Sequence, residues 1–295
     1  MSAGVNVRAI DHPRLALGEG PLWEERSGRF HFVDRFGQKI HWWDPASGER
    51  GDTSYPAATA SFGFRQGEGL VVALDTGLYL SGPDIDGLEF IGDPEAAQPL
   101  RSDYNDGKVD PAGRFLVVGA NRPVEGAAAR ATLYSLEGCD IRTLDSPFYI
   151  GNGPTWSPDG TTFYLNDSLQ QCMYAYDYDV ATGAVANRRV FADLSELAGI
   201  PDGATVDEAG GVWMAFCEGS AIAHLSPAGE ILEVIPMPTT HITSVAFGGP
   251  ELDQLLVTSI DPAAIGHASE DDFGGALFLV TGLGVRGLPA GRFAA

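Results

Sequence analysis

Four short segments of the chain share one order of residues: an acid or amide, a glycine directly after it or one place later, and an apolar residue four places on. They begin at Glu19, Asn105, Asn152 and Asp202. Each leads into a turn with glycine, nine residues after Glu19 and eight residues after the other three. Carboxylate and amide oxygens suit hard divalent cations such as Ca²⁺, Mg²⁺ or Mn²⁺, and carboxylates also bind Zn²⁺. The repetition predicts a site for one divalent cation, provided that the fold brings these residues together.

Turn formation is the competing explanation of these segments, because Asn-Gly and Asp-Gly are common turn pairs. A single pair of this kind would need no further function. Four segments in the same phase, one of them led by a glutamate, favour a shared site. The glycine beside each polar residue would then allow a close backbone approach and a positive φ.

Other catalytic and cofactor motifs are weak or absent in the sequence. Residues 282–287 match the dinucleotide pattern GxGxxG, but only eight residues follow them, too few for a βαβ unit. No GxSxG nucleophile motif occurs, and the six histidines show neither HxH nor HExxH spacing. These patterns argue against a dinucleotide enzyme, a serine hydrolase of the α/β type and a histidine-based zinc site.

The elements that position the four polar residues come from a longer repeat. An apolar residue, a turn with glycine and a β-rich run recur in six segments: 23–34, 64–74, 109–119, 156–167, 206–216 and 247–259. A second pair of β-rich runs follows each copy, and the runs alternate apolar and polar residues between turns. Four strands repeated six times predict an all-β fold, a six-bladed β-propeller that forms a single domain over residues 1–295. A pair of β-sandwiches would not explain six copies in one phase.

The propeller predicts where the polar residues meet. The innermost strand of each blade runs along the central channel, so the loop before it lies at one mouth. Blades one, three, four and five carry Glu19, Asn105, Asn152 and Asp202 there, whereas blades two and six carry Ala60 and Thr243. We expect residues 5–10 to pair with the last blade, which would close the ring and remove an exposed strand edge.

Composition limits the partners of the protein. The chain of 295 residues has a formal charge of -22, which argues against binding to nucleic acid or to an anionic membrane. Its N-terminus lacks the apolar segment of a secretion signal, and no stretch is long enough to span a membrane. Three cysteines without a CxxC pattern are typical of reduced thiols. We therefore expect a cytoplasmic protein with a small-molecule ligand, present as a monomer or small homo-oligomer.

Several motifs along almost the whole chain resemble those of one protein family. They lie at residues 17–23, 32–34, 105–114, 174–178, 187–189, 201–203, 247–249 and 281–285. The sequence resembles the family of regucalcin (senescence marker protein), gluconolactonase and luciferin-regenerating enzyme. The resemblance implies a six-bladed propeller that binds one divalent metal on its axis and hydrolyses a lactone.

The resemblance also implies roles for single residues. Glu19, Asn152 and Asp202 correspond to the metal ligands of the family. Asp202 is also the proposed proton donor and acceptor, and Asn105 matches a residue that contacts substrate. The sequence departs from the family beside this residue, because Asp103 stands where an arginine is expected.

Three further positions bear on substrate binding. Arg101 lies two residues before the position of the expected arginine and is a candidate to replace it in substrate binding. The usual Gly-Thr-Met after the second strand of blade three is Gly-Ala-Asn at residues 119–121. Glu125 is a candidate for the acidic substrate contact of the family. These departures concern the substrate and leave the metal ligands unchanged.

The expected activity is that of a metal-dependent lactonase acting on a sugar lactone or a related small lactone. The cation would polarise the lactone carbonyl, and Asp202 would remove a proton from the attacking water. Two alternatives remain open at this point. One is a non-catalytic calcium-binding regulatory propeller, and the other is a metal-dependent hydrolase of a non-sugar lactone or ester.

Overall fold

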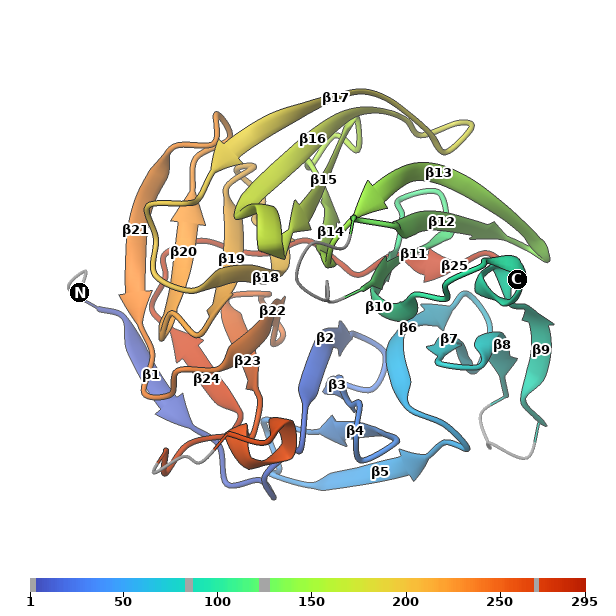
Figure 1. Cartoon of the computed structure of the whole chain (residues 1–295). Coiled ribbons are helices and arrows are strands. Elements are labelled where there is room, and N and C mark those ends of the chain that lie inside the picture. The colour runs from blue at the N-terminus through green and yellow to red at the C-terminus, as the bar shows by residue number, and fades with distance from the viewer. Residues whose placement is uncertain (1–3, 83–86, 122–127, 268–270) are drawn as a thin grey trace.

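The computed structural model describes residues 4–82, 87–121, 128–267 and 271–295. Six antiparallel sheets stand side by side in a ring (Figure 1), five of them with four strands and one with a fifth strand added. The predicted six-bladed β-propeller is confirmed. In every blade the first strand of the repeat is the innermost one, as the contacts between first strands of neighbouring blades show.

The strands of a blade follow one another along the chain. Blades one and two consist of β2 (Gly18–Glu24), β3 (Arg29–Asp34), β4 (Lys39–Trp43), β5 (Arg50–Ser54), β6 (Thr59–Arg65), β7 (Leu70–Leu74), β8 (Gly77–Ser81) and β9 (Glu89–Gly92). Blades three and four consist of β10 (Asp103–Val109), β11 (Phe115–Ala120), β12 (Ala131–Glu137), β13 (Asp140–Phe148), β14 (Gly151–Trp156), β15 (Thr162–Asp167), β16 (Cys172–Asp179) and β17 (Ala184–Asp193). Blades five and six consist of β18 (Ile200–Val206), β19 (Val212–Cys217), β20 (Ala221–Leu225), β21 (Ile231–Pro236), β22 (Ile242–Gly248), β23 (Gln254–Ser259), β24 (Phe278–Thr281) and β1 (Asn6–Ala9).

Apolar side chains fill the spaces between neighbouring blades. The repeated tryptophans Trp23, Trp156 and Trp213 are 7%, 6% and 1% exposed. Trp23 packs with side chains of blade six, Trp156 with side chains of blade three, and Trp213 with side chains of blade six. The alternation of the strands therefore buries both faces of each blade, which fixes the blades relative to the channel.

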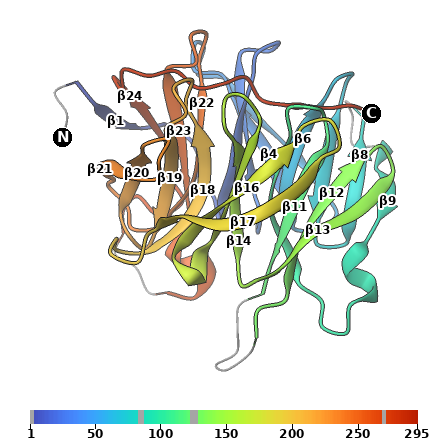
Figure 2. The same cartoon turned by 90° about the horizontal axis from the view of Figure 1, so that it is seen from above.

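Two parts of the chain close the ring. β1 pairs with β24 in antiparallel register, as predicted for residues 5–10. The last residues cross one face of the ring (Figure 2), where β25 (Arg292–Phe293) pairs in parallel with β6. On the way the tail accepts a hydrogen bond from the Glu208 amide and donates one to the Leu252 carbonyl. It thereby ties blades five, six and two together.

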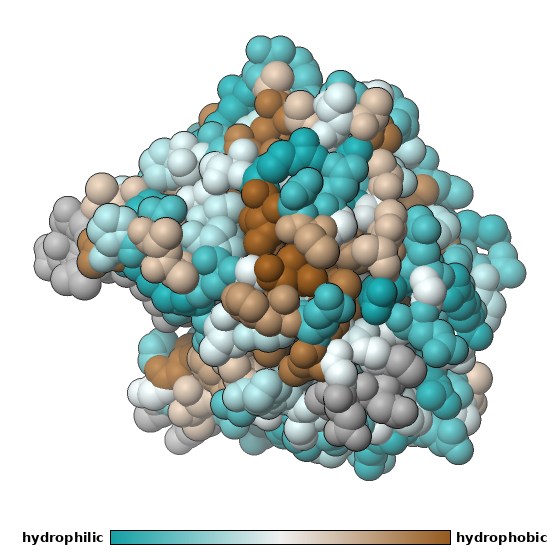
Figure 3. Space-filling model, turned by 90° about the vertical axis from the view of Figure 1, so that its right-hand side faces the viewer, coloured by the Kyte–Doolittle hydropathy of each residue, from teal (hydrophilic) through white to brown (hydrophobic). Residues whose placement is uncertain are grey.

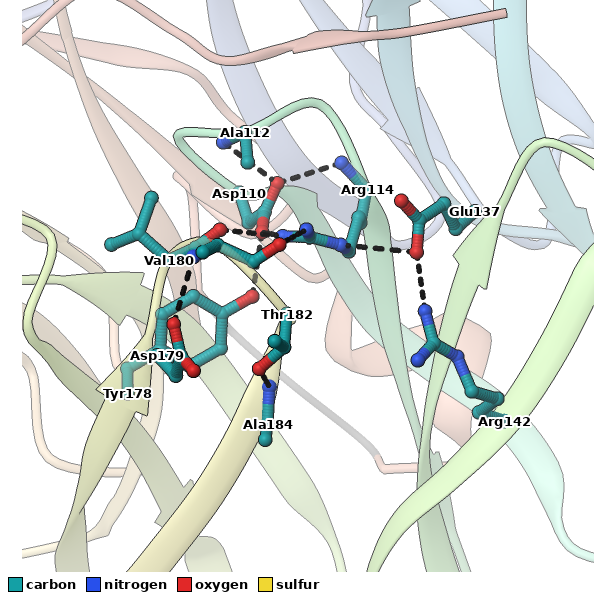
Figure 4. A network of polar contacts seen from close by, with 11 residues as sticks. Asp110, Ala112, Arg114, Glu137, Arg142, Tyr178, Asp179, Val180, Thr182 and Ala184 are labelled. Atoms are coloured by element: carbon teal, nitrogen blue, oxygen red, sulfur yellow. Dashed lines mark hydrogen bonds and ion pairs between the residues drawn. The ribbon is translucent and has the colours of Figure 1, made fainter.

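A buried polar network joins blades three and four (Figure 4). Asp110 follows β10, and its carboxylate accepts hydrogen bonds from Arg114 Nη1 (2.9 Å) and from the Tyr178 hydroxyl (2.6 Å). The Arg114 guanidinium also donates to the carbonyls of Val180 and Ala181 in the next blade. Asp110 is 0% exposed and Arg114 is 5% exposed, so the pair is shielded from water.

One side of the outer surface carries an apolar area. Figure 3 shows apolar side chains gathered on the side of the ring that carries β9 in Figure 1. Phe90 on β9 is 56% exposed, and Ile91 and Ile141 are partly buried against the core beneath it.

All three cysteines are free thiols. The described part of the chain contains no helix long and apolar enough to cross a membrane.

Candidate functional site

A backbone irregularity recurs at the start of every innermost strand. The register with the second strand shifts after Glu19, Tyr104, Asn152 and Pro201 in blades one, three, four and five, and at the matching place in blades two and six. Such bulges turn side chains out of the regular alternation and are common beside active sites. The four polar residues therefore lie on the strands themselves, at the bulge. The prediction that they lie in the preceding loops was wrong in this respect.

The glycines beside the polar residues do not all serve the same purpose. Gly20 and Gly153 have φ of 49° and 60°, so the predicted positive φ holds there. Gly203 has no positive φ, but a Cβ at this position would lie 2.0 Å from Ser244 Oγ. A Cβ on Gly107 would lie 2.7 Å from Ser61 Oγ. At these two positions glycine is needed because the neighbouring innermost strand approaches closely.

The structure brings all four repeated polar residues into one cavity. It has a volume of about 490 Å³ and is lined by Glu19, Asn105, Asn152 and Asp202, which come from four different blades. Arg101 and Asp103 line the same cavity. Glu125 lies outside the described residues.

Hydrogen bonds hold the two amides in one orientation. Asn105 Nδ2 donates to Asn152 Oδ1 (2.6 Å) and to the Gly151 carbonyl (3.0 Å). Asn152 Nδ2 donates to Ser168 Oγ (2.9 Å). Because its nitrogen is bound to Ser168, the amide oxygen of Asn152 faces Asn105. The backbone at Asp202 is fixed as well, since its carbonyl accepts a hydrogen bond from Asn166 Nδ2 (2.7 Å).

Negative charge is concentrated in this part of the channel. Burial, followed by the charges of Asp202 and Asp106, raises the pKa of Glu19 well above its ordinary value. Burial also raises the pKa of Asp106, although its carboxylate accepts hydrogen bonds from the amides of Gly107 (2.7 Å) and Gly153 (2.8 Å). Burial lowers the pKa of Lys108, the nearby cation that faces Asp106. Carboxylates held together away from water favour the binding of a cation among them.

The donor set fits a hard divalent cation. Two carboxylates, Glu19 and Asp202, and the amide oxygen of Asn152 are oxygen donors of the kind such ions prefer. No three His, Cys, Asp or Glu side chains form a metal-binding group within the described ranges, so a site here requires the amide. Cys217 also lines the cavity, but burial raises the pKa of its thiol well above the ordinary value, which disfavours the thiolate that soft metals need.

The cavity also contains groups that the repeat did not predict. Arg35 donates to Asp75 Oδ1 (2.9 Å) and to the Tyr104 carbonyl (2.6 Å). Arg101 is bound to the Asp93 carboxylate and to the carbonyl of Asp75. The guanidinium groups of both arginines are therefore engaged by the protein.

The position of these groups relative to the strands could have identified them from the sequence. Because the first two strands of a blade are antiparallel, the second strand ends at the mouth where the first begins. Arg35, Asp75, Asn121 and Cys217 stand at or just after the ends of second strands, and all four line the cavity.

A second cavity of about 600 Å³ lies at the other end of the innermost strands, beneath the C-terminal tail. Its described lining includes Lys108 and three tryptophan or phenylalanine side chains, but no aspartate, glutamate, histidine or cysteine. Its described lining therefore lacks the carboxylates of the first cavity. Of the two cavities, only the one at the mouth that carries Glu19 and Asp202 has carboxylates in its described lining.

Comparison with known proteins shows the family to which the chain belongs. Residues 17–261 match the model of the SMP-30/Gluconolactonase/LRE-like region. The chain is 31% identical to regucalcin of Xenopus laevis, with 99% of each chain covered. It is 34% identical to a pentonolactonase of Haloferax volcanii, with 90% of this chain and 89% of the relative covered. A solved luciferin-regenerating enzyme has a TM-score of 0.90 and 28% identity over 99% of this chain and 100% of the other. The chain therefore belongs to the SMP-30/gluconolactonase/LRE-like family.

Proposed function

We propose that the protein hydrolyses a small lactone in the 490 Å³ cavity, with one divalent cation held by Glu19, Asn152 and Asp202. The observation that carries this proposal is the convergence of these three residues and Asn105 from four blades at one mouth of the channel. The cavity is of a size that suits a small molecule. The relative named as a pentonolactonase supports the substrate class.

The chemistry divides between the cation and the protein. A bound cation would supply Lewis acidity at the lactone carbonyl oxygen, where negative charge develops. Asp202 accepts a proton from the attacking water as the water oxygen bonds to the carbonyl carbon. The ring C–O bond then breaks, and Asp202 returns the proton to the departing ring oxygen, which yields a hydroxy acid. Asn105, held by Asn152 and Gly151, presents its amide oxygen to a hydroxyl of the substrate.

Metal removal tests the proposal directly. Purified protein is stripped with a chelator and reloaded in turn with Ca²⁺, Mg²⁺, Mn²⁺ or Zn²⁺, and a panel of aldonolactones and simple lactones is assayed. We expect turnover to fall at least tenfold on stripping and to return with one or more of the ions. Equal rates for stripped and loaded protein would contradict the proposal.

Substitution of the proposed base provides a second test. Asp202→Asn keeps the size of the side chain but removes the proton acceptor, so we expect a loss of turnover of about 10²–10⁴-fold. The melting temperature of the metal-free variant should stay close to that of the metal-free parent. A variant with full activity would exclude Asp202 as the base.

A non-catalytic calcium-binding role is the second candidate function. It is favoured by the relatives named regucalcin, one of which is described as a calcium-binding protein in its solved structure from Agrobacterium tumefaciens, at 25% identity and a TM-score of 0.89 over 98% of each chain. The two functions differ in one measurement. If Ca²⁺ raises the melting temperature but no lactone in the panel is hydrolysed with any ion, the regulatory role is correct.

A further inference from the structure

The second cavity, beneath the C-terminal tail, is built around one repeated position of the innermost strands. Three residues after the position that Glu19 occupies in blade one, the six strands carry, in blade order, Leu22, Gly63, Lys108, Thr155, Thr205 and Ala246. All of these except the glycine line the cavity of about 600 Å³. Five blades therefore contribute one side chain each at the same level of the channel. Lys108 is the charged member of this set.

Lys108 is held by the protein through one hydrogen bond. Its Nζ donates to the carbonyl of Ala204 in blade five (2.8 Å). The charge of Asp106 acts on it, but within the described ranges no ion pair joins its ammonium group to a carboxylate. An ammonium group has three N–H donors, so two of them are not used by these residues. Because the half-buried Lys108 side chain lines the cavity, they are available to a molecule there.

A second donor in the cavity wall also lacks an acceptor. Trp156 lines the cavity and is 6% exposed, and its Nε1 is buried with no partner in the described part of the chain. Arg292, the other cation of the wall, is already engaged, because it donates to Glu24 Oε1 (2.7 Å). Since the described lining contains no carboxylate, donors without partners outnumber the side-chain acceptors that could receive them.

Most of the remaining wall is apolar. Trp23, Trp156 and Phe247 lie between neighbouring blades and border the cavity, and residues 288–291 of the tail complete it. Ligand cavities are typically of about 300–1,000 Å³, with a mostly apolar wall and a few polar groups that orient the ligand. The second cavity has both properties and is separate from the one that contains Glu19 and Asp202.

The chemistry of Lys108 indicates which polar group a ligand would carry. A buried charge is costly unless it is paired, and a ligand carboxylate would supply the counter-charge that Lys108 lacks. Its two oxygens can accept both unused N–H donors. A cationic ligand would be repelled by Lys108. A phosphate would bring more negative charge than one ammonium group compensates, into a chain of charge -22.

We infer that the second cavity is a binding site for a small monocarboxylate with an apolar body. The carboxylate binds Lys108, and the body packs against the aromatic side chains of the wall. The inference is independent of the proposed lactonase function, because no residue that lines the first cavity takes part in it.

Calorimetric titration with benzoate tests the inference. We expect Lys108→Met to bind benzoate about 10- to 100-fold more weakly than the parent, because hydrogen bonds from a charged group are lost. Lys39→Met is the matched control and should bind like the parent, because Lys39 is the other lysine of the chain and pairs with Asp52 at the surface. Benzamide has the shape of benzoate without the charge, and acetate has the carboxylate without the apolar body. The parent should bind each of them at least tenfold more weakly than benzoate.

A variant that keeps Lys108 tests the cavity itself. Thr205 is half-buried and lines the cavity from blade five, so Thr205→Phe should fill the space and abolish benzoate binding. This variant carries the test if Lys108→Met does not fold. Arg130→Gln is the control for the first cavity, which Arg130 lines, and should bind benzoate like the parent. Stripping the protein with a chelator should likewise leave benzoate binding unchanged.

Several outcomes would overturn the inference. It is wrong if the parent does not bind benzoate, or if Lys108→Met or Thr205→Phe folds and binds benzoate as tightly as the parent. Loss of binding on chelation or in Arg130→Gln would place the carboxylate in the first cavity instead. Benzamide bound as tightly as benzoate would exclude the carboxylate as the recognised group, and acetate bound as tightly would exclude the apolar body.

Discussion

Replacing Arg114 with methionine should destabilise the protein without touching its cavity. Methionine keeps most of the length of the side chain but removes the guanidinium between blades three and four. Asp110 would keep the amides of Ala112 and Arg114 and the Tyr178 hydroxyl, but would lose its counter-charge at a position that is 0% exposed. Removing one partner of a buried ion pair costs about 3–5 kcal/mol. The remaining hydrogen bonds of Asp110 place the expected loss at about 3–4 kcal/mol.

The loss in the free energy of unfolding corresponds to a shift of the melting temperature that depends on the length of the chain. An unfolding entropy of about 2.1 cal/mol/K per residue gives roughly 620 cal/mol/K for 295 residues. A loss of about 3–4 kcal/mol therefore lowers the melting temperature by about 5–6 °C. Differential scanning calorimetry of the metal-free protein measures this shift without a contribution from the cation.

The same network offers a matched control. Arg142 binds Glu137, which also contacts Arg114, but the side chain of Arg142 is 52% exposed. An exposed ion pair contributes about 0–1 kcal/mol, so Arg142→Met should shift the melting temperature by less than about 2 °C. The double variant Asp110→Asn/Arg114→Met should lose less than the sum of its single variants, because no charge is left unpaired. Equal melting temperatures for Arg114→Met and Arg142→Met would refute the reasoning.

Two further predictions concern acid stability and the metal site. Burial lowers the pKa of His31 and of His41 to about 4, so both stay neutral in the folded protein while the unfolded chain takes up protons below pH 6.5. The free energy of unfolding, measured with urea, should therefore be highest above pH 6.5 and fall by about 2 kcal/mol per histidine on going to pH 5. His31→Gln should remove part of this pH dependence. Gly203→Ala places a Cβ 2.0 Å from Ser244 Oγ and should weaken metal binding at least tenfold in a titration. Gly67→Ala, with no atom within 4 Å, is the control and should bind metal normally.

The repeat in the sequence predicted the ring because equivalent residues of the repeat pack between neighbouring blades. Trp23, Trp156 and Trp213 recur where one blade meets the next, and the glycine turns recur where a hairpin reverses. The convergence of Glu19 and Asp202 followed from their phase, since equivalent positions of a propeller meet on its axis. A local pattern was sufficient at these positions because equivalent residues have the same position in each copy of the repeat.

The contacts of the other cavity residues could not be predicted in this way. Arg35, Asn121 and Arg130 lie at strand ends and in connections, where each blade differs from the others. Whether such an arginine is free for a ligand depends on its neighbours: Asp75 engages Arg35, whereas no described side chain engages Arg130. These contacts join residues far apart in the sequence, and no repeat records them.

The order in which the strands that close the ring are synthesised has a consequence for folding during translation. β1 is synthesised before every other described strand, yet its partner β24 begins at Phe278. At about 5–20 residues per second the first strand waits roughly 15–55 seconds for its partner during translation. The segment that ties blades two, five and six together is made after the strands of every blade. The last of these contacts therefore forms only after all six blades have been made, and a chain that ended before Arg286 would have six blades without the contacts of this segment.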